Sequence, residues 1–163
     1  MLPTYQGILV ATDLSPHASL VFRHAVMLAR FHKAPIYLVH VVQKLDNSAR
    51  TYVATVLGEE SLNRLEEDHQ KEALQTIRQK IVDLAQAELA GFPEDQARFS
   101  EVEVRIGNPV EQILAAVKQH QADVIVMGTH SKGRIEHSFL GSVAEKIIAR
   151  AVCPTFVVPL PKD

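Results

Sequence analysis

The chain of 163 residues has one cysteine, Cys153, no tryptophan and a net charge of only −2. A single cysteine excludes an internal disulfide and fits a reducing compartment. The small net charge gives no basic surface that would hold a nucleic-acid backbone. No apolar run approaches the roughly 20 residues of a membrane helix, and residues 1–6 lack the features of a signal peptide. We therefore expect a cytoplasmic protein without a nucleic-acid partner or a membrane span.

Hydrophobic residues are plentiful, at 47% of the chain, which at this length is enough to bury one core without disulfides or metal. We expect one domain over residues 1–163. Short apolar runs rich in β-branched residues alternate with segments of helical spacing, which predicts an α/β three-layer sandwich around a parallel sheet. The five expected strands are Gly7–Ala11, Ile36–Val42, Phe99–Ile106, Val124–Met127 and Cys153–Pro159.

Local signals predict where several elements begin, end or lie exposed. Ser15 followed by Pro16 predicts a helix start, as does Asn108 followed by Pro109. The strand over residues 99–106 alternates apolar and polar side chains, so it is expected at a sheet edge with one exposed face.

Two further segments carry expectations. A long amphipathic helix is predicted over residues 62–89. The segment 43–60 before it has no clear period and is interpreted as a long connection that could fold over a ligand. The last strand lies between Pro154 and Pro159, which favours a second sheet edge because proline cannot sit within a ladder.

The stretch Gly128–Val143 joins the fourth strand to the last helix. Its glycines at 128, 133 and 141 are expected to allow positive φ angles and close approach to a ligand. Ser142 opens a helix, whose free N–H groups and dipole favour an anion. We interpret the stretch as a phosphate-binding loop at the carboxyl end of a strand, where ligands bind in open α/β sheets.

Simpler interpretations exist for the same residues. Ser142 and Glu145 have the spacing of a capping box, which needs no ligand. Asp13, after the first strand, is suited either to a ligand or to a turn or cap. His130 and His137 have no supporting cluster of ligands in the sequence, so no metal site is expected.

The order of these features resembles the universal stress protein family, and the resemblance spans essentially the whole chain. Nucleotide-binding members carry Gly, two residues, Gly, nine residues, then Gly and Ser or Thr. This chain has Gly128, Ser131, Gly141 and Ser142 at the same spacings, with serine in place of the second glycine. A serine forced into a left-handed conformation costs about 1–2 kcal/mol, which corresponds to about tenfold in affinity.

The resemblance implies a Rossmann-like fold of the adenine nucleotide alpha hydrolase type and a site for ATP, ADP or AMP, with Mg²⁺ as a companion of ATP. Asp13 would contact the ribose, the backbone of Val41 the adenine, and the loop the phosphates. It also implies a homodimer through the strand Thr155–Val158. The implied nucleotide-binding residues are Ala11, Thr12, Asp13, Val39, Val41, Met127, Gly128, His130, Ser131, Gly141, Ser142 and Val143.

Three functions follow from the sequence. The first is a stress-response sensor or regulator that binds an adenine nucleotide. The second is a protein of the same fold that acts only through protein contacts, which Ser131 favours. The third is a slow ATP hydrolase, against which the sequence has neither a Gly-x-x-x-x-Gly-Lys-Ser/Thr loop nor a Gly-x-Ser-x-Gly motif.

Overall fold

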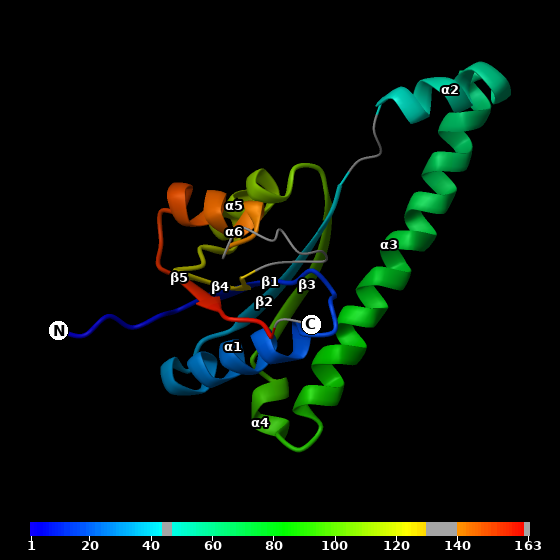
Figure 1. The fold of residues 1–163 in the computed structure, drawn as a ribbon. Helices are drawn as coiled ribbons and strands as arrows, with labels where there is room; N and C mark the ends of the chain where they lie inside the picture. The colour runs from blue at the N-terminus through cyan, green and yellow to red at the C-terminus, as the bar shows by residue number, and fades with distance from the viewer. Residues whose placement is uncertain (44–46, 130–139, 162–163) are drawn as a thin grey trace.

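The computed structural model describes residues 1–43, 47–129 and 140–161. Five parallel strands form one sheet in the order β3-β2-β1-β4-β5 (Figure 1). The predicted α/β fold with a five-stranded parallel sheet is therefore confirmed. The strands are β1 Ile8–Ala11, β2 Ile36–Val42, β3 Phe99–Ile106, β4 Val124–Gly128 and β5 Thr155–Val158. The described helices are α1 Ala18–His32, α2 Asn47–Leu57, α3 Glu59–Leu89, α4 Pro93–Gln96, α5 Pro109–His120 and α6 Ser142–Arg150.

Helices cover both faces of the sheet. On one face, α1 and the second half of α3 pack against Ile8 and Val10 of β1. On the other face, α5 and α6 pack against Leu9. All three strand residues are at most 1% exposed. The continuous apolar run of β1 thus reflects burial on both faces, as expected for a central parallel strand.

The strand order reverses at β1, which lies between β2 and β4. Ala11 at the end of β1 pairs with Val39, and Val10 pairs with Val126. The carboxyl ends of these three strands therefore open side by side at the switch point, where ligands bind in this class of sheet.

The start of α1 differs from the prediction. The helix begins at Ala18, and its N-cap is His17, whose side chain makes no capping hydrogen bond. Ser15 and Pro16 instead lie in the preceding turn, where the carbonyl of Ser15 accepts from the N–H of Ala18 at 3.0 Å. The left-handed conformation of Leu14, with φ 57°, redirects the chain just before them. A positive φ angle is uncommon for leucine, so the sequence does not predict this conformation.

The start of α5 agrees with the prediction. Pro109 is its first residue, and the side-chain oxygen of Asn108 accepts from the N–H of Glu111 at 3.2 Å. This bond satisfies one of the donors that a helix start leaves without a partner.

The interpretation of segment 43–60 as an irregular connection over a ligand is wrong for residues 47–57. Residues 47–57 form α2, which lies at the far end of α3, away from the sheet (Figure 1). Arg50 holds it there through Glu66 at 3.2 Å and Asn63 at 2.6 Å. The segment lacked a clear apolar stripe because α2 packs on the first half of α3, which itself extends beyond the sheet.

Both expected edge strands are at edges, with β3 on one side and β5 on the other. The polar face of β3, however, is not simply exposed. The side chain of Glu103 is 14% exposed because the C-terminal end of α5 covers it. Because α5 packs on the face of β3 that carries Glu103, this face is partly buried, although the alternating pattern predicted that it would be exposed.

Cys153 is half-buried just before β5. Burial, and to a smaller extent the charge of Asp123, raises the pKa of its thiol. Because the thiolate is the nucleophile, we expect iodoacetamide at neutral pH to alkylate the folded protein several-fold more slowly than the protein unfolded in urea. Mass spectrometry of timed samples measures both rates on the same single thiol, and equal rates would contradict the prediction.

Candidate functional site

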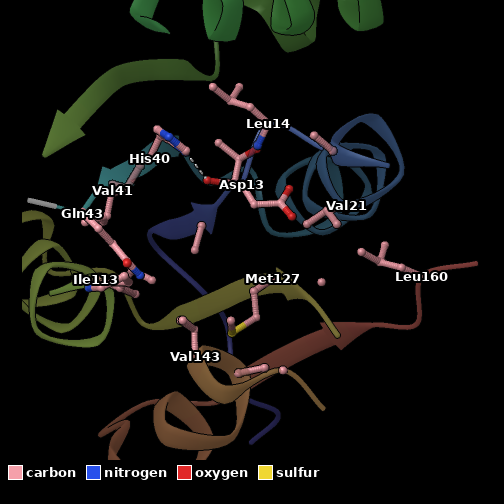
Figure 2. Close-up of a pocket in the computed structure, with 18 of the residues that line it drawn as sticks. Asp13, Leu14, Val21, His40, Val41, Gln43, Ile113, Met127, Val143 and Leu160 are labelled. Carbon is pink, nitrogen blue, oxygen red and sulfur yellow. Dashed lines mark hydrogen bonds between the residues drawn. The ribbon is translucent and has the colours of Figure 1, made fainter. Parts of the chain in front are cut away.

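A pocket of about 530 Å³ opens at the carboxyl ends of β1, β2 and β4 (Figure 2). Its walls are the turn after β1, the end of β2, the beginnings of α5 and α6, and one face of α3. This volume lies within the range of small-molecule sites, about 300–1,000 Å³.

The structure brings most of the predicted site residues together around this pocket. His130 and Ser131 lie outside the described residues, as do Gly133 and His137. Their contribution, including the effect of Ser131, stays a prediction. The predicted residues that line the pocket are Ala11, Thr12, Asp13, Val39, Val41, Met127, Gly128, Gly141, Ser142 and Val143.

The turn after β1 places Asp13 at the pocket. The N–H of Thr12 donates to the carbonyl of Val39 at 2.9 Å, which ties the turn to β2. The Thr12 hydroxyl accepts from the N–H of Leu14 at 3.2 Å, and Asp13 Oδ1 accepts from the N–H of Ser15 at 2.9 Å. The turn alternative for Asp13 is therefore correct, yet its carboxylate has further acceptor capacity at the pocket.

His40 was not among the predicted residues, although it borders the pocket between two that were. Its Nδ1 lies 2.7 Å from the carbonyl oxygen of Thr12 (Figure 2). Since a carbonyl only accepts, Nδ1 must carry the proton. In the neutral ring Nε2 is then a hydrogen-bond acceptor.

The N-terminus of α6 forms the opposite wall. Its N-cap is Gly141 and Ser142 is its first helical residue, so the capping-box interpretation of Ser142 and Glu145 is wrong. The N–H of Glu145 donates to the carbonyl of Gly141 at 3.0 Å. The N–H groups of the first helical residues have no intrahelical acceptor, and Ser142, Val143 and Ala144 all line the pocket. Such a terminus favours an anion.

Gly128 and Gly141 do not have the positive φ angles expected of them. Gly141 has φ −67° and ψ 155°, and its N–H donates to the carbonyl of Thr129 at 2.6 Å, closing the base of the loop. At Gly128 the requirement is space, because a Cβ there would lie 2.7 Å from Leu160 Cδ1 and 3.4 Å from Val21 Cγ2. Leu160 itself lines the pocket.

Most of the other lining residues were missed because they come from helices and the C-terminal segment, while Leu14, His40 and Gln43 lie at the ends of β1 and β2. Periodicity marks Ile77 and Ile113 as inward-facing but does not say that they border a cavity, and nothing local distinguishes Lys80 from other exposed lysines. The ionisable side chains among the described lining residues are Asp13, His40 and Lys80. The missed residues are Leu14, Ala18, Val21, His40, Gln43, Ile77, Lys80, Pro109, Ile113, Ala144 and Leu160.

Solved structures share this fold. MJ0577 of Methanocaldococcus jannaschii matches with a TM-score of 0.72 at 25% identity, over 99% of this chain and 100% of its own. A universal stress protein solved in complex with cAMP matches with a TM-score of 0.62 at 18% identity, over 98% and 100%. The fold and the switch-point pocket therefore define an α/β protein with a nucleotide-binding-type fold.

Sequence comparison gives the family. The model of the universal stress protein family matches residues 4–159. A universal stress protein of Thermus aquaticus is 31% identical over 154 residues, which cover 94% of this chain and 98% of that protein. The chain belongs to the universal stress protein family. Across the described residues, no helix is both long enough and apolar enough to cross a membrane.

Proposed function

We propose that this universal stress protein binds an adenine nucleotide in the switch-point pocket and acts as a stress-response sensor or regulator. The observation that carries the proposal is the grouping of three features around one cavity: the carboxylate of Asp13, the end of β2 at Val41, and the N-terminus of α6. These are the groups that a ribose, a base and a phosphate require.

The proposed arrangement of the nucleotide follows from the chemistry of the walls. The adenine lies at the end of β2, where Val39, Val41 and Ile113 offer apolar surface and backbone polar groups. The ribose hydroxyls donate to Asp13, and the phosphates accept from the N–H groups at the start of α6. Mg²⁺ accompanying ATP would find oxygen donors in the Asp13 carboxylate and the Ser142 hydroxyl, both at the pocket.

The cAMP complex of a relative supports the proposal in one respect, since a protein of this fold accommodates an adenine nucleotide. We propose regulation rather than turnover because of the ionisable groups at the described pocket wall. Of these groups, His40 already gives its Nδ1 hydrogen to Thr12, and no hydroxyl or thiol among the described residues is hydrogen-bonded to its ring.

The test begins with mass spectrometry of the freshly purified protein, where we expect an adenine nucleotide at near one per chain. After the nucleotide is removed, calorimetry compares ATP binding by the wild type and by Asp13→Asn. Asparagine keeps an acceptor for the Ser15 N–H but loses the charge. A hydrogen bond to a charged group contributes about 1.5–3 kcal/mol, so affinity should fall about tenfold or more.

The matched control is Asp68→Asn, on an exposed position of α3, which should bind ATP like the wild type. Wild-type protein that neither carries nor binds an adenine nucleotide would overturn the proposal and leave function through protein contacts alone. A phosphate-release assay on the same samples distinguishes a slow ATP hydrolase.

We also propose that the active form is a homodimer paired through β5. This strand is short, lies at an edge and is partly apolar, with Phe156 38% exposed. Exposed apolar edges promote association with another strand, and a second copy of β5 in antiparallel orientation satisfies both edges at once.

A further inference from the structure

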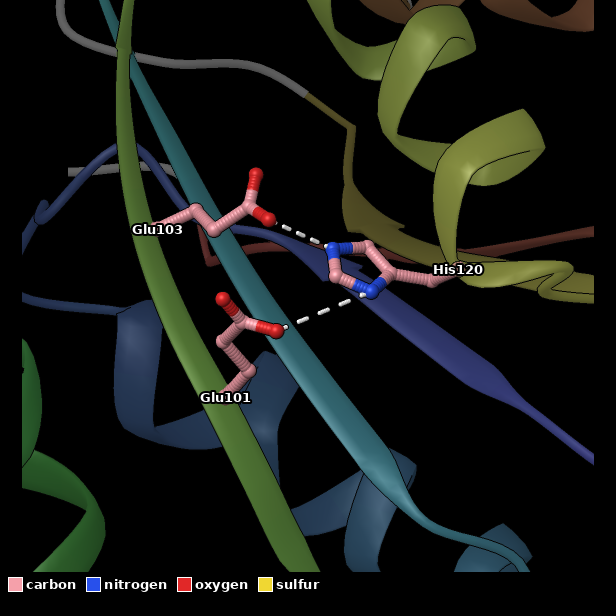
Figure 3. Close-up of side chains that lie close together, drawn as sticks. All are labelled: Glu101, Glu103 and His120. Carbon is pink, nitrogen blue, oxygen red and sulfur yellow. Dashed lines mark hydrogen bonds and ion pairs between the residues drawn. The ribbon is translucent and has the colours of Figure 1, made fainter.

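A second group of side chains with metal-binding chemistry lies outside the nucleotide pocket. Glu101 and Glu103 project from β3 toward His120, the last residue of α5 (Figure 3). One ligand atom from each of the three residues lies within 4.8 Å of the others. None of the three lines the pocket, and their separation in sequence concealed the group from motif reasoning.

The ring of His120 is held in a fixed orientation. Its side chain is 7% exposed and stacks on Tyr37, with ring centroids 4.4 Å apart and an interplanar angle of 18°. Its Nε2 lies 2.7 Å from Glu103 Oε1. Arg105 and Gln119 in turn hold Glu103, through contacts of 2.5 Å and 3.0 Å.

These contacts decide which ring nitrogen is available. The Glu103 carboxylate is ion-paired with Arg105 and can only accept, so Nε2 of His120 donates to it. In the neutral imidazole the lone pair is then on Nδ1. A carboxylate that accepts from the far nitrogen is the usual partner of a metal-ligating histidine, because it fixes the ring and raises its basicity.

Nδ1 faces the remaining carboxylate. Glu101 Oε2 lies 3.9 Å from it, which is too long for a hydrogen bond (Figure 3). A cation placed between them would accept both the lone pair and the carboxylate oxygen as ligands. Two ligands on one tetrahedral zinc ion lie roughly 3.3 Å apart. A small movement of Glu101, whose side chain is 50% exposed, brings its oxygen to that distance.

The surroundings also favour a cation. His120 ends a helix of 12 residues, and the C-terminal end of a helix carries partial negative charge. Arg105 is paired with Glu103, so its charge is already balanced. The negative charge beside Nδ1 is therefore that of Glu101.

We propose that His120 Nδ1 and Glu101 bind a divalent transition-metal ion, with zinc as the best match, while Glu103 positions the imidazole from the other side. Imidazole nitrogen with carboxylate oxygen is a ligand set that zinc accepts, and water completes the four-coordinate shell. Two protein ligands give an affinity in the micromolar range rather than that of a closed structural site.

The test is calorimetric titration of the EDTA-treated, nucleotide-free full-length protein with zinc chloride. We expect micromolar binding of one ion at this site. Glu101→Gln should weaken it about tenfold or more, and Glu103→Gln should do so through the orientation of the ring. Visible absorption of bound Co²⁺ gives a second readout, which should be lost in His120→Gln.

Glu72→Gln, an exposed substitution on α3, is the control and should bind zinc like the wild type. Glu101→Gln is the decisive variant because no hydrogen bond of the described structure depends on its carboxylate, so the fold should be kept. Equal zinc affinity of this variant and the wild type, including no binding by either, overturns the proposal. Because no nucleotide is present, this outcome leaves the proposed nucleotide site untouched.

Discussion

The double variant Gly128→Ala/Gly141→Val is expected to bind ATP about tenfold or more weakly than the wild type while keeping its fold. At Gly128 the new methyl group would lie 2.7 Å from Leu160 Cδ1, so the leucine side chain must move within the pocket that it lines. At Gly141 the backbone is already extended, so valine is tolerated there. Its branched side chain then occupies space at the helix N-terminus. A loss of about 1.4 kcal/mol from either effect is tenfold in affinity.

Calorimetry measures this loss, and circular dichroism verifies the fold. Gly91→Ala is the matched control, since a Cβ at Gly91 meets no atom within 4 Å. Its ATP affinity should equal that of the wild type. Equal affinity of the double variant would mean that these glycines do not border the nucleotide.

A compensating substitution separates the effect of the new methyl group at residue 128 from that of the valine at residue 141. Leu160→Ala removes the two atoms nearest to the new methyl group at residue 128, which are the Cδ1 and Cγ atoms of the leucine. Adding it to Gly128→Ala should therefore restore part of the lost ATP affinity. If Leu160→Ala alone weakens binding as much as Gly128→Ala does, the leucine contributes directly to the pocket wall.

The sheet could be predicted from the sequence because its strands carry their own signal. Strand β2 has the predicted bounds, and β1 and β4 differ from theirs by one residue at one end, since burial on both faces makes such central strands continuously apolar. The start of α5 was also predictable, because the cap at Asn108 is a local hydrogen bond within three residues.

The starts of α1 and α6 were not predictable in the same way. Ser142 followed by Glu145 has the spacing of a capping box, but the helix starts one residue too early for Ser142 to be its cap, since Ser142 is already its first helical residue. Ser15 fails as a cap because Leu14 turns the chain first.

The candidate site likewise contains residues that the sequence predicted and residues that it did not. Motif spacing identified the residues at strand ends, such as Asp13 and Gly128. It did not identify Lys80, which reaches the pocket from a helix that crosses above it. It also missed the approach of His120 to Glu101, because that contact arises from how α5 ends beside β3.

Val157→Pro is expected to convert the proposed dimer into a folded monomer. The N–H of Ile125 donates to the carbonyl of Pro154, and the N–H of Thr129 donates to that of Val158. Backbone groups alternate along a strand, so those of Val157 point away from β4 and toward the free edge. Proline there removes the outward N–H without breaking a bond to β4.

Sedimentation velocity measures the oligomeric state, with circular dichroism to show that the variant is folded. Val157→Thr keeps the N–H and the branched side chain, so it should sediment as the wild type does. In an antiparallel pair related by a two-fold axis, one substitution acts on both copies, so the loss of association should be complete rather than partial. A monomeric wild type, or a Val157→Pro variant that remains dimeric, would exclude pairing through β5.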